Sequence, residues 1–267
     1  MVVFDRRRRS EIELTRSFGN HLQEYRRVGG LSDRRWADAL VLRARRALAA
    51  ALDLLYPPQC VHCQRVGVLL CRRCTGQLVS GPLRVVMGLD GVRVRTTFEG
   101  PAASAIHALK YSGVTRLADP LGELLAQAWP ESGLAADLIC AVPLHPQRQT
   151  ERGYNQSALL ARRVASLTGL PYVDDAVARI RHTETQTHLD AQARRENVAG
   201  AFAANTQRVD NLSIALVDDV LTTGATLAAC AGALRASGAR SVYGLVLASA
   251  VYDKVADAGG RDTPADR

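Results

Sequence analysis

The chain has 267 residues, of which 47% are hydrophobic, and its formal net charge is +8. No apolar run is long enough to span a bilayer, and no apolar stretch follows the early basic residues as in a secretory signal, so the sequence predicts a cytoplasmic protein with no membrane partner. The first 50 residues hold twelve arginines against six acidic residues, so they carry most of the net positive charge. The remainder of the chain therefore lacks the composition of a strongly basic nucleic-acid binder.

The N-terminal part of the chain precedes the regular α/β pattern. Residues 1–32 are charged and have no clear apolar face, which is typical of a disordered extension. Residues 33–55 carry apolar side chains at helical spacing, and this amphipathic helix should end before Pro57 and Pro58. The expected division of the chain is a disordered extension over 1–32, a helix and cysteine module over 33–80, an α/β domain over 90–252 and a disordered tail over 253–267.

Four cysteines form two C-x-x-C pairs, namely Cys60, Cys63, Cys71 and Cys74. Each pair can direct both of its sulfurs at one ion, and four thiolates suit a tetrahedral Zn²⁺ site. The alternatives are two disulfides or free buried thiols, and disulfides are disfavoured in a cytosolic chain. Because four thiolates leave no open coordination position, we expect the zinc to be structural.

From about residue 92, apolar segments alternate with helical patterns. The predicted strands cover residues 93–100, 137–144, 212–219 and 241–250. The predicted helices cover residues 103–113, 116–129, 154–169 and 225–239. Continuous apolar strands that alternate with helices predict an α/β fold in which helices cover both faces of a parallel sheet.

The stretch IALVDDVLTTGAT, residues 214–226, joins a buried strand to a helix. Its two acids, Asp218 and Asp219, lie near the carboxyl end of the strand, where open parallel sheets bind ligands. The following backbone N–H groups and the helix dipole favour an anion, and Gly224 lets the chain approach it closely. Carboxylates beside a phosphate site suit a sugar phosphate. The alternative is a surface acid pair followed by a helix-capping threonine.

Two further stretches carry positive charge toward the same edge of the sheet. VPLHPQRQTERGYNQS follows a buried strand, and its Arg148 and Arg152 can bind phosphate oxygens in a loop stiffened by prolines. A solvated basic loop is the alternative. Lys110 is one of only two lysines in a chain with 32 arginines. It is either a point-charge contact to phosphate or an ordinary surface lysine.

The stretch IALVDDVLTTGAT resembles the phosphoribosyl pyrophosphate signature of type I phosphoribosyltransferases. The resemblance implies a type I phosphoribosyltransferase-like sheet in which Asp218 and Asp219 hold the ribose hydroxyls and Mg²⁺ binds with the pyrophosphate. It also implies that the loop after the acids binds the 5′-phosphate. The residues of that loop are Leu221, Thr222, Thr223, Gly224, Ala225 and Thr226.

The cysteine module, HALKYSG, VPLHPQRQTERGYNQS and RHTETQTHLDAQARRENVAGAF occur in an order that resembles the ComF/GntX family over about residues 45–250. That resemblance implies a link to competence and DNA uptake, with single-stranded DNA or DNA-processing proteins as partners. It puts the pyrophosphate-binding loop at Arg148 and Arg152. The likeness to type I phosphoribosyltransferases implies a mobile loop over residues 181–197, whose candidate catalytic side chains are Thr183, Gln186, Arg194 and Asn197.

Two functions therefore stand side by side at this point. The first is an enzyme that transfers phosphoribosyl to an acceptor. Purine phosphoribosyltransferases have an aspartate where this chain has Thr222, so a purine acceptor is disfavoured. The second is a non-catalytic or ligand-gated accessory protein of DNA uptake, which binds single-stranded DNA or DNA-processing partners.

Overall fold

The computed structural model describes residues 57–82, 84–130, 135–181 and 200–250. The chain divides into two compact units, residues 1–58 and 59–267, and the elements below belong to the second. The predicted extension, the amphipathic helix over 33–55 and the tail over 253–267 lie outside the described residues. No helix within the described ranges has the length and apolar character needed to cross a membrane.

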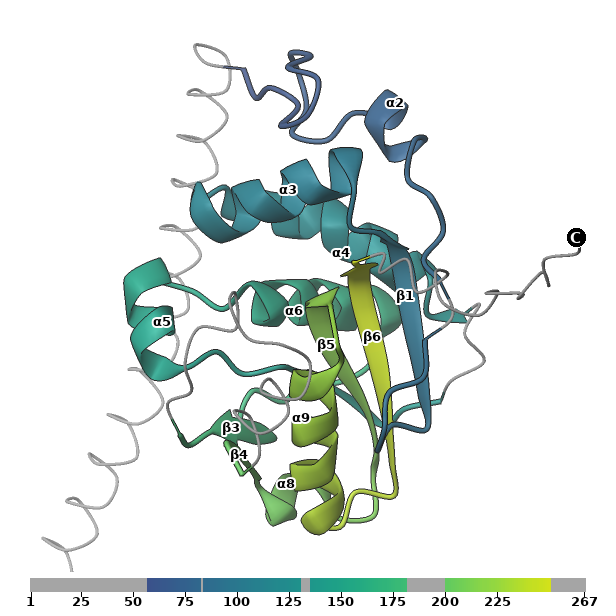
Figure 1. Cartoon of the computed structure of the whole chain (residues 1–267), viewed down its shortest axis with the longest axis vertical. Helices are drawn as coiled ribbons and strands as arrows, with labels where there is room; N and C mark the ends of the chain where they lie inside the picture. Colours follow the sequence, from purple (N-terminus) through teal and green to yellow (C-terminus); the bar gives the residue numbers. More distant parts are fainter. Residues whose placement is uncertain (1–56, 83, 131–134, 182–199, 251–267) are drawn as a thin grey trace, which may run out of the picture. The chain divides into compact units, whose positions relative to one another are not determined.

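Four parallel strands form the central sheet, in the order β1-β6-β5-β2 (Figure 1). Their bounds are β1 Gly91–Thr97, β2 Leu138–Ala141, β5 Ser213–Leu221 and β6 Ser241–Ser249. Residue Val217 of β5 pairs with Leu245 of β6 on one side and with Ala141 of β2 on the other. The predicted strands are confirmed as one parallel sheet, and β5, which carries the acid pair, is an interior strand.

Helices cover both faces of this sheet, as the sequence predicts. Side chains alternate between the two faces along β5: Ala215 and Val217 join one apolar cluster, and Ile214 and Leu216 join the other. The first cluster contains residues of α3 Gly100–Tyr111, α4 Ala118–Gln127 and α6 Gln156–Thr168. The second contains residues of α9 Ala225–Ala236. A short 3₁₀ turn, η1 Thr115–Leu117, leads into α4.

Helix α6 shows how local chemistry sets the ends of an element. The side chain of Asn155 accepts hydrogen bonds from the N–H groups of Ser157 and Ala158, which is the usual role of an N-cap. The helix ends at Gly169, whose φ of 77° lies in the left-handed region, as the sequence predicts. This well-defined start fixes the first turn of α6 beside the carboxyl end of the sheet.

Several short elements were not predicted. They are α2 Arg72–Thr75, α5 Pro146–Arg152, α8 Thr206–Val209, and the strands β3 Val177–Arg179 and β4 Phe202–Ala204. Strands β3 and β4 pair antiparallel and pack into the second cluster through Val177 and Phe202. The predicted mobile loop over 181–197 lies outside the described residues except for Arg181.

Candidate functional site

The signature stretch forms the turn from β5 into α9. Gly224 is the residue before α9, and its φ of 79° is one that L side chains rarely adopt. A Cβ built there would lie 2.9 Å from Cγ2 of Val86. Both the backbone angle and the close approach of Val86 thus require glycine, and the turn keeps the start of α9 close to the end of β5.

A cavity of about 190 Å³ lies at this turn. Its lining residues come from α3, from the end of β5 and from the start of α9. They are Lys110, Asp218, Val220, Leu221, Thr222, Gly224, Ala225, Thr226 and Leu227. All predicted loop residues except Thr223 line this cavity. The Oγ1 of Thr223 instead accepts a hydrogen bond from the N–H of Ala225 at 3.4 Å, within the turn itself.

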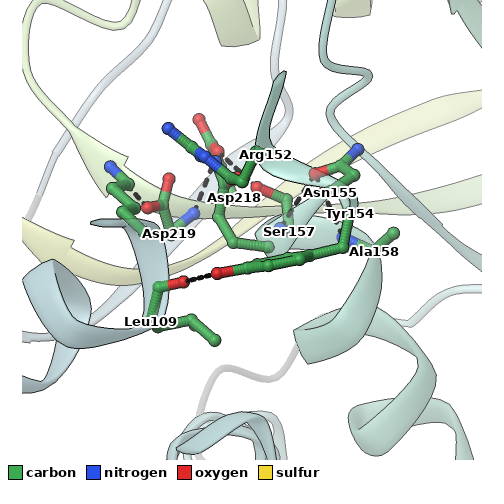
Figure 2. A network of polar contacts seen from close by, with 10 residues as sticks. Leu109, Arg152, Tyr154, Asn155, Ser157, Ala158, Asp218 and Asp219 are labelled. Carbon is green, nitrogen blue, oxygen red and sulfur yellow. Dashed lines mark hydrogen bonds and ion pairs between the residues drawn. The ribbon is translucent and has the colours of Figure 1, made fainter. Parts of the chain in front are cut away.

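The two acids are buried, with exposed fractions of 9% for Asp218 and 3% for Asp219. The Oδ1 of Asp218 accepts hydrogen bonds from Ser157 Oγ and from the N–H of Asp219, both at 2.9 Å (Figure 2). Asp218 lines the 190 Å³ cavity, and Asp219 does not. Neighbouring residues of a strand point to opposite sides, which accounts for this difference between the two acids.

Lys110 is the partner of the second acid. Its Nζ lies 2.5 Å from Oδ2 of Asp219, and the lysine side chain is 17% exposed. The alternative of an ordinary surface lysine does not hold, because the last turn of α3 carries the ammonium against β5. Lys110 also lines the cavity, so its ammonium contributes positive charge there while it pairs with Asp219.

The carboxyl of Asp218 has an unusual acidity. Burial raises its pKa to about 7, the negative charge of Asp219 acts in the same direction, and Lys110, the N–H of Asp219 and the hydroxyl of Ser157 oppose the shift. Near neutral pH this carboxyl is therefore divided between its neutral and ionised forms. Only the ionised form offers both oxygens as charged acceptors to a ligand hydroxyl.

The arginines of the second basic stretch lie on a helix and not in the predicted loop. Helix α5 begins with Pro146, whose fixed φ suits the first helical position. The preceding His145 is the N-cap, and its Nδ1 accepts a hydrogen bond from the N–H of Gln147 at 3.2 Å. Arg148 and Arg152 follow on this helix. Arg152 also donates a hydrogen bond to the side chain of Gln156.

A second cavity, of about 490 Å³, lies beside α5 and the end of α3. Its lining combines three cationic side chains with two tyrosines, a glycine and one acid. The residues are Lys110, Tyr111, Gly113, Arg148, Glu151, Arg152 and Tyr154. Lys110 lines both cavities. It is therefore shared by the cavity of the loop predicted to bind the 5′-phosphate and the cavity of the two arginines predicted to bind pyrophosphate.

Three polar residues of this network were missed at the sequence level (Figure 2). Ser157 bonds to Asp218, the hydroxyl of Tyr154 donates to the carbonyl of Leu109, and Nδ2 of Asn155 donates to the carbonyl of Val142 at 2.9 Å. All three lie in the quoted RGYNQS. The position of Asn155 before a helix is a local signal for an N-cap. The contacts of Ser157 and Tyr154 span 61 and 45 residues, so no local pattern could have predicted them.

The four cysteines converge on one point, with all four sulfurs within 4.8 Å of one another. Sγ atoms are 3.7 Å apart for Cys60 and Cys74 and 3.6 Å apart for Cys63 and Cys71. A tetrahedron with Zn–S bonds of about 2.3 Å has sulfurs about 3.8 Å apart, so the donor set fits zinc. His62 is not part of it, since its Nδ1 lies 3.0 Å from Ser104 Oγ.

The cysteine centre is attached to the main core. Cys60, Cys71 and Cys74 are buried in the same apolar cluster as Ile106 and Leu109 of α3. The N–H of Cys74 is the main cause that lowers the pKa of the Cys71 thiol, whereas burial is the main cause that raises the pKa of the Cys74 thiol to about 12. The candidate catalytic residues Thr183, Gln186, Arg194 and Asn197, by contrast, lie outside the described residues.

Curated relatives connect the chain to one family. It is 34% identical over 199 residues to the DNA utilization protein YhgH of Escherichia coli O157:H7, which covers 73% of this chain and 84% of that protein. It is 32% identical over 200 residues to competence protein F of Haemophilus influenzae, which covers 72% of this chain and 85% of that protein. The chain belongs to the competence protein F (ComF/YhgH) family. No protein-family model matches it.

Other matches are shorter. YhgH of Salmonella typhi is 37% identical over 147 residues, and the chain spans 64% of that protein's length. Among solved structures, the chain is similar to the allosteric regulatory enzyme of purine biosynthesis, with 25% identity and a TM-score of 0.34 over 48% of this chain and 25% of that one. TT1426 from Thermus thermophilus has 17% identity and a TM-score of 0.32 over 52% and 86%. The fold described above rests on the strand order and register of the chain itself.

Proposed function

We propose that the chain binds phosphoribosyl pyrophosphate with Mg²⁺ and transfers the phosphoribosyl group to a non-purine acceptor. One observation carries the proposal: Asp218 and the Gly224-led start of α9 line a single cavity at the carboxyl end of an interior parallel strand. That combination offers acceptors for sugar hydroxyls beside donors for a phosphate.

The lining of the two cavities supports one arrangement of the ligand. The 5′-phosphate would lie against the turn from Thr222 to Thr226, where N–H groups, threonine hydroxyls and the helix dipole favour an anion. The ribose hydroxyls would donate to Asp218. The pyrophosphate would extend past Lys110 toward Arg148 and Arg152 in the larger cavity.

The reaction would break one bond and form another at C1 of the ribose. The acceptor forms the new bond to C1, and the pyrophosphate leaves with the electron pair of the C1–O bond. Lys110 and Arg152 lie where negative charge would grow on the leaving group, and such fixed cations lower the barrier. Mg²⁺ bound to the pyrophosphate would add positive charge at that group.

The acceptor class and the candidate catalytic side chains are proposed from the family resemblance. Thr222 lines the cavity where a purine enzyme has a carboxylate, which supports an acceptor other than a purine. The proposed catalytic side chains are Thr183, Gln186, Arg194 and Asn197. We also propose that the four cysteines hold one structural Zn²⁺, which the sulfur spacings support.

A second candidate function comes from the names of two relatives. DNA utilization protein YhgH is named for a role with DNA, and competence protein F is named for competence. In this alternative, the chain binds single-stranded DNA or DNA-processing proteins, and the sugar-phosphate site controls that binding or takes no part in it.

Calorimetry with Mg²⁺ and phosphoribosyl pyrophosphate tests the main proposal. Saturable binding by the full chain is expected, and its absence would overturn the proposal. Release of pyrophosphate on addition of an acceptor then separates an enzyme from a binding protein. Salt-dependent binding of a single-stranded oligonucleotide tests the alternative, because phosphate contacts weaken as salt is added.

A further inference from the structure

Ser157, in the first turn of α6, has an exposed fraction of only 1%. Serines inside helices commonly donate to a carbonyl of the preceding turn. Ser166 of the same helix does so, since its hydroxyl donates to the carbonyl of Arg163 at 2.9 Å. The hydroxyl of Ser157 instead donates to Oδ1 of Asp218 on β5, 61 residues away in the chain. Ser157 is thus a buried hydroxyl whose partner is the acid of the ligand cavity.

The backbone of Ser157 is held against the sheet. Its N–H donates to Oδ1 of Asn155 at 3.0 Å, and Nδ2 of Asn155 donates to the carbonyl of Val142 at 2.9 Å (Figure 2). The N–H of Val142 in turn donates to the carbonyl of Val217, the residue before Asp218, at 2.9 Å. The start of α6 is therefore attached to the strand that carries the acid, which restricts where the hydroxyl of Ser157 can lie.

The contact gives the two oxygens of Asp218 different roles. Oδ1 accepts from the hydroxyl of Ser157 and from the N–H of Asp219, both at 2.9 Å. A backbone N–H can only donate, so Oδ1 stays an acceptor in either protonation state of the carboxyl. The proton of the neutral carboxyl is therefore favoured on Oδ2, the oxygen that neither donor engages. Ionisation changes Oδ2 from a donor hydroxyl into a charged acceptor.

Four other elements place charged or titratable groups around this carboxyl. Burial and the charge of Asp219 raise the pKa of Asp218, whereas Lys110, the N–H of Asp219 and the hydroxyl of Ser157 lower it. Burial also raises the pKa of the Cys230 thiol well above its usual value, so that thiol is neutral. These groups are Asp219 on β5, Lys110 on α3, Cys230 on α9, and Arg152 on α5, which donates to the side chain of Gln156 beside Ser157. The hydroxyl of Ser157 is the side-chain contribution that can be removed without a change of charge.

We propose that Ser157 is a positioning residue of the ligand site: its hydroxyl holds Oδ1 of Asp218 and so presents Oδ2 to the ribose hydroxyls as a charged acceptor. The proposal rests on the proposed function in one respect, since the ribose is the ligand assigned to Asp218. Ser157 is not among the lining residues of either cavity. It therefore acts on the ligand through Asp218 and leaves the phosphate-binding turn unchanged.

The test uses the full-length chain and matched variants. Ser157→Ala removes the hydroxyl but leaves Oδ1 its bond from the N–H of Asp219, so this variant should fold. Ser166→Ala, the control, is the same substitution at an exposed position of the same helix. A double variant combines Ser157→Ala with Asp218→Asn and is compared with Asp218→Asn alone. Thermal denaturation verifies that each protein is folded.

Two measurements are made on these proteins. The first needs no ligand: ¹³C chemical shifts of the aspartate carboxyls are followed from about pH 4 to about pH 9. The signal that is absent from Asp218→Asn identifies Asp218. The second is the affinity for phosphoribosyl pyrophosphate with Mg²⁺, measured by calorimetry at about pH 7 and about pH 9.

We expect Ser157→Ala to raise the pKa of Asp218, with an increase of about tenfold in proton affinity, because a hydrogen bond to the charged form is lost. Affinity for phosphoribosyl pyrophosphate should fall about fivefold at pH 7, where less of the carboxyl is then ionised, and about twofold or less at pH 9, where most of it is ionised in both proteins. Ser166→Ala should match wild type within about twofold. In the Asp218→Asn background, Ser157→Ala should have no further effect beyond about twofold.

Three results would overturn the proposal. One is an unchanged pKa of Asp218 in Ser157→Ala. Another is a loss of affinity that is equal at pH 7 and pH 9, because a merely structural defect does not follow the ionisation of Asp218. The third is a full effect of Ser157→Ala in the Asp218→Asn background. A wild-type chain that binds no phosphoribosyl pyrophosphate, together with a raised pKa in Ser157→Ala, would refute the proposed function and leave the control of Asp218 by Ser157 standing.

Discussion

Lys110 Nζ and Asp219 Oδ2 lie 2.5 Å apart, although 109 residues separate them in the chain. The contact ties the last turn of α3 to the carboxyl end of β5. Lys110 lines the 190 Å³ cavity together with Asp218, whereas its partner Asp219 does not line it. The positive charge that lines both cavities is thus held in place by the protein before any ligand arrives.

Removal of this lysine should destabilise the fold. Lys110→Met leaves the carboxylate of Asp219 buried without its partner, and we expect a loss of about 3–5 kcal/mol in the free energy of unfolding. In the double variant Lys110→Met, Asp219→Asn, much of that loss should be recovered because the charge of Asp219 is removed together with its partner. Urea denaturation measures both. A loss below about 1 kcal/mol for the single variant would show that the pair behaves as a solvent-screened surface contact.

Replacement of both acids should weaken phosphoribosyl pyrophosphate binding. Asp218→Ala, Asp219→Ala removes the proposed acceptor of the ribose hydroxyls and the partner that orients Lys110, while the Gly224 turn remains. We expect a loss of about 2–4 kcal/mol, or roughly 30- to 1,000-fold in Kd, by calorimetry. Asp174→Ala, which removes an exposed acid outside both cavities, is the control. Equal affinity of wild type and the double variant would contradict the ribose assignment.

Binding should depend on pH through Asp218. Since the pKa of this carboxyl in the folded chain is about 7, lowering the pH from 8 to 6 converts most of it to the neutral form and should weaken binding about tenfold. Titration of the ligand's own phosphates adds to this slope, so the control is Asp218→Asn, which retains only the ligand's part. Identical pH profiles for the two proteins would show that Asp218 is not the acceptor.

The same carboxyl should shape the pH dependence of stability. Its pKa is raised from the value of about 3.9 in an unfolded chain, so the neutral form is favoured in the fold. The contribution of this carboxyl to the free energy of unfolding is fully present below about pH 4, and it is lost as the pH rises through about 7. The stability of Asp218→Asn relative to wild type should therefore increase from pH 5 to pH 8 in thermal denaturation. A constant difference would refute the raised pKa.

Gly224, just before α9, and Gly232, inside α9, provide a matched pair of substitutions to alanine. Gly224→Ala would place a Cβ 2.9 Å from Val86 at a positive φ, and it should cost at least about 1–2 kcal/mol and weaken phosphoribosyl pyrophosphate binding. Gly232 lies inside α9 with no atom within 4 Å of a built Cβ, so Gly232→Ala should stabilise by about 0.5–1 kcal/mol and leave binding unchanged. Similar effects of both would show that the turn has no special role.

The cysteine centre should hold one metal ion per chain. Cys71→Ser removes one of four sulfurs, so the purified variant should lose zinc and unfold at a lower temperature, since metal binding and folding are coupled. Cys140→Ser is the comparison, because Cys140 is a buried core cysteine outside the cluster. That variant should retain its zinc whatever its stability. Full zinc content in Cys71→Ser would refute a four-thiolate site.

The sequence by itself determined the elements whose signals are local. Periodicity identified the four strands and the main helices, C-x-x-C spacing identified the four sulfurs, and the signature stretch identified the turn at Gly224. Each of these depends on residues close together in the chain, because backbone angles, side-chain alternation and glycine requirements are set within a few positions. The parallel sheet with two helical layers follows from the same alternation.

Only the tertiary structure decided which side chains meet. The sequence could not show that Lys110 pairs with Asp219, that Ser157 bonds to Asp218, or that Tyr111 opens onto the cavity of Arg152. It also missed that β5 directs its two acids to different sides, although strand alternation made this foreseeable. Such contacts join α3, α5, α6 and β5, and they depend on how distant segments pack, for which no short stretch of sequence carries a signal.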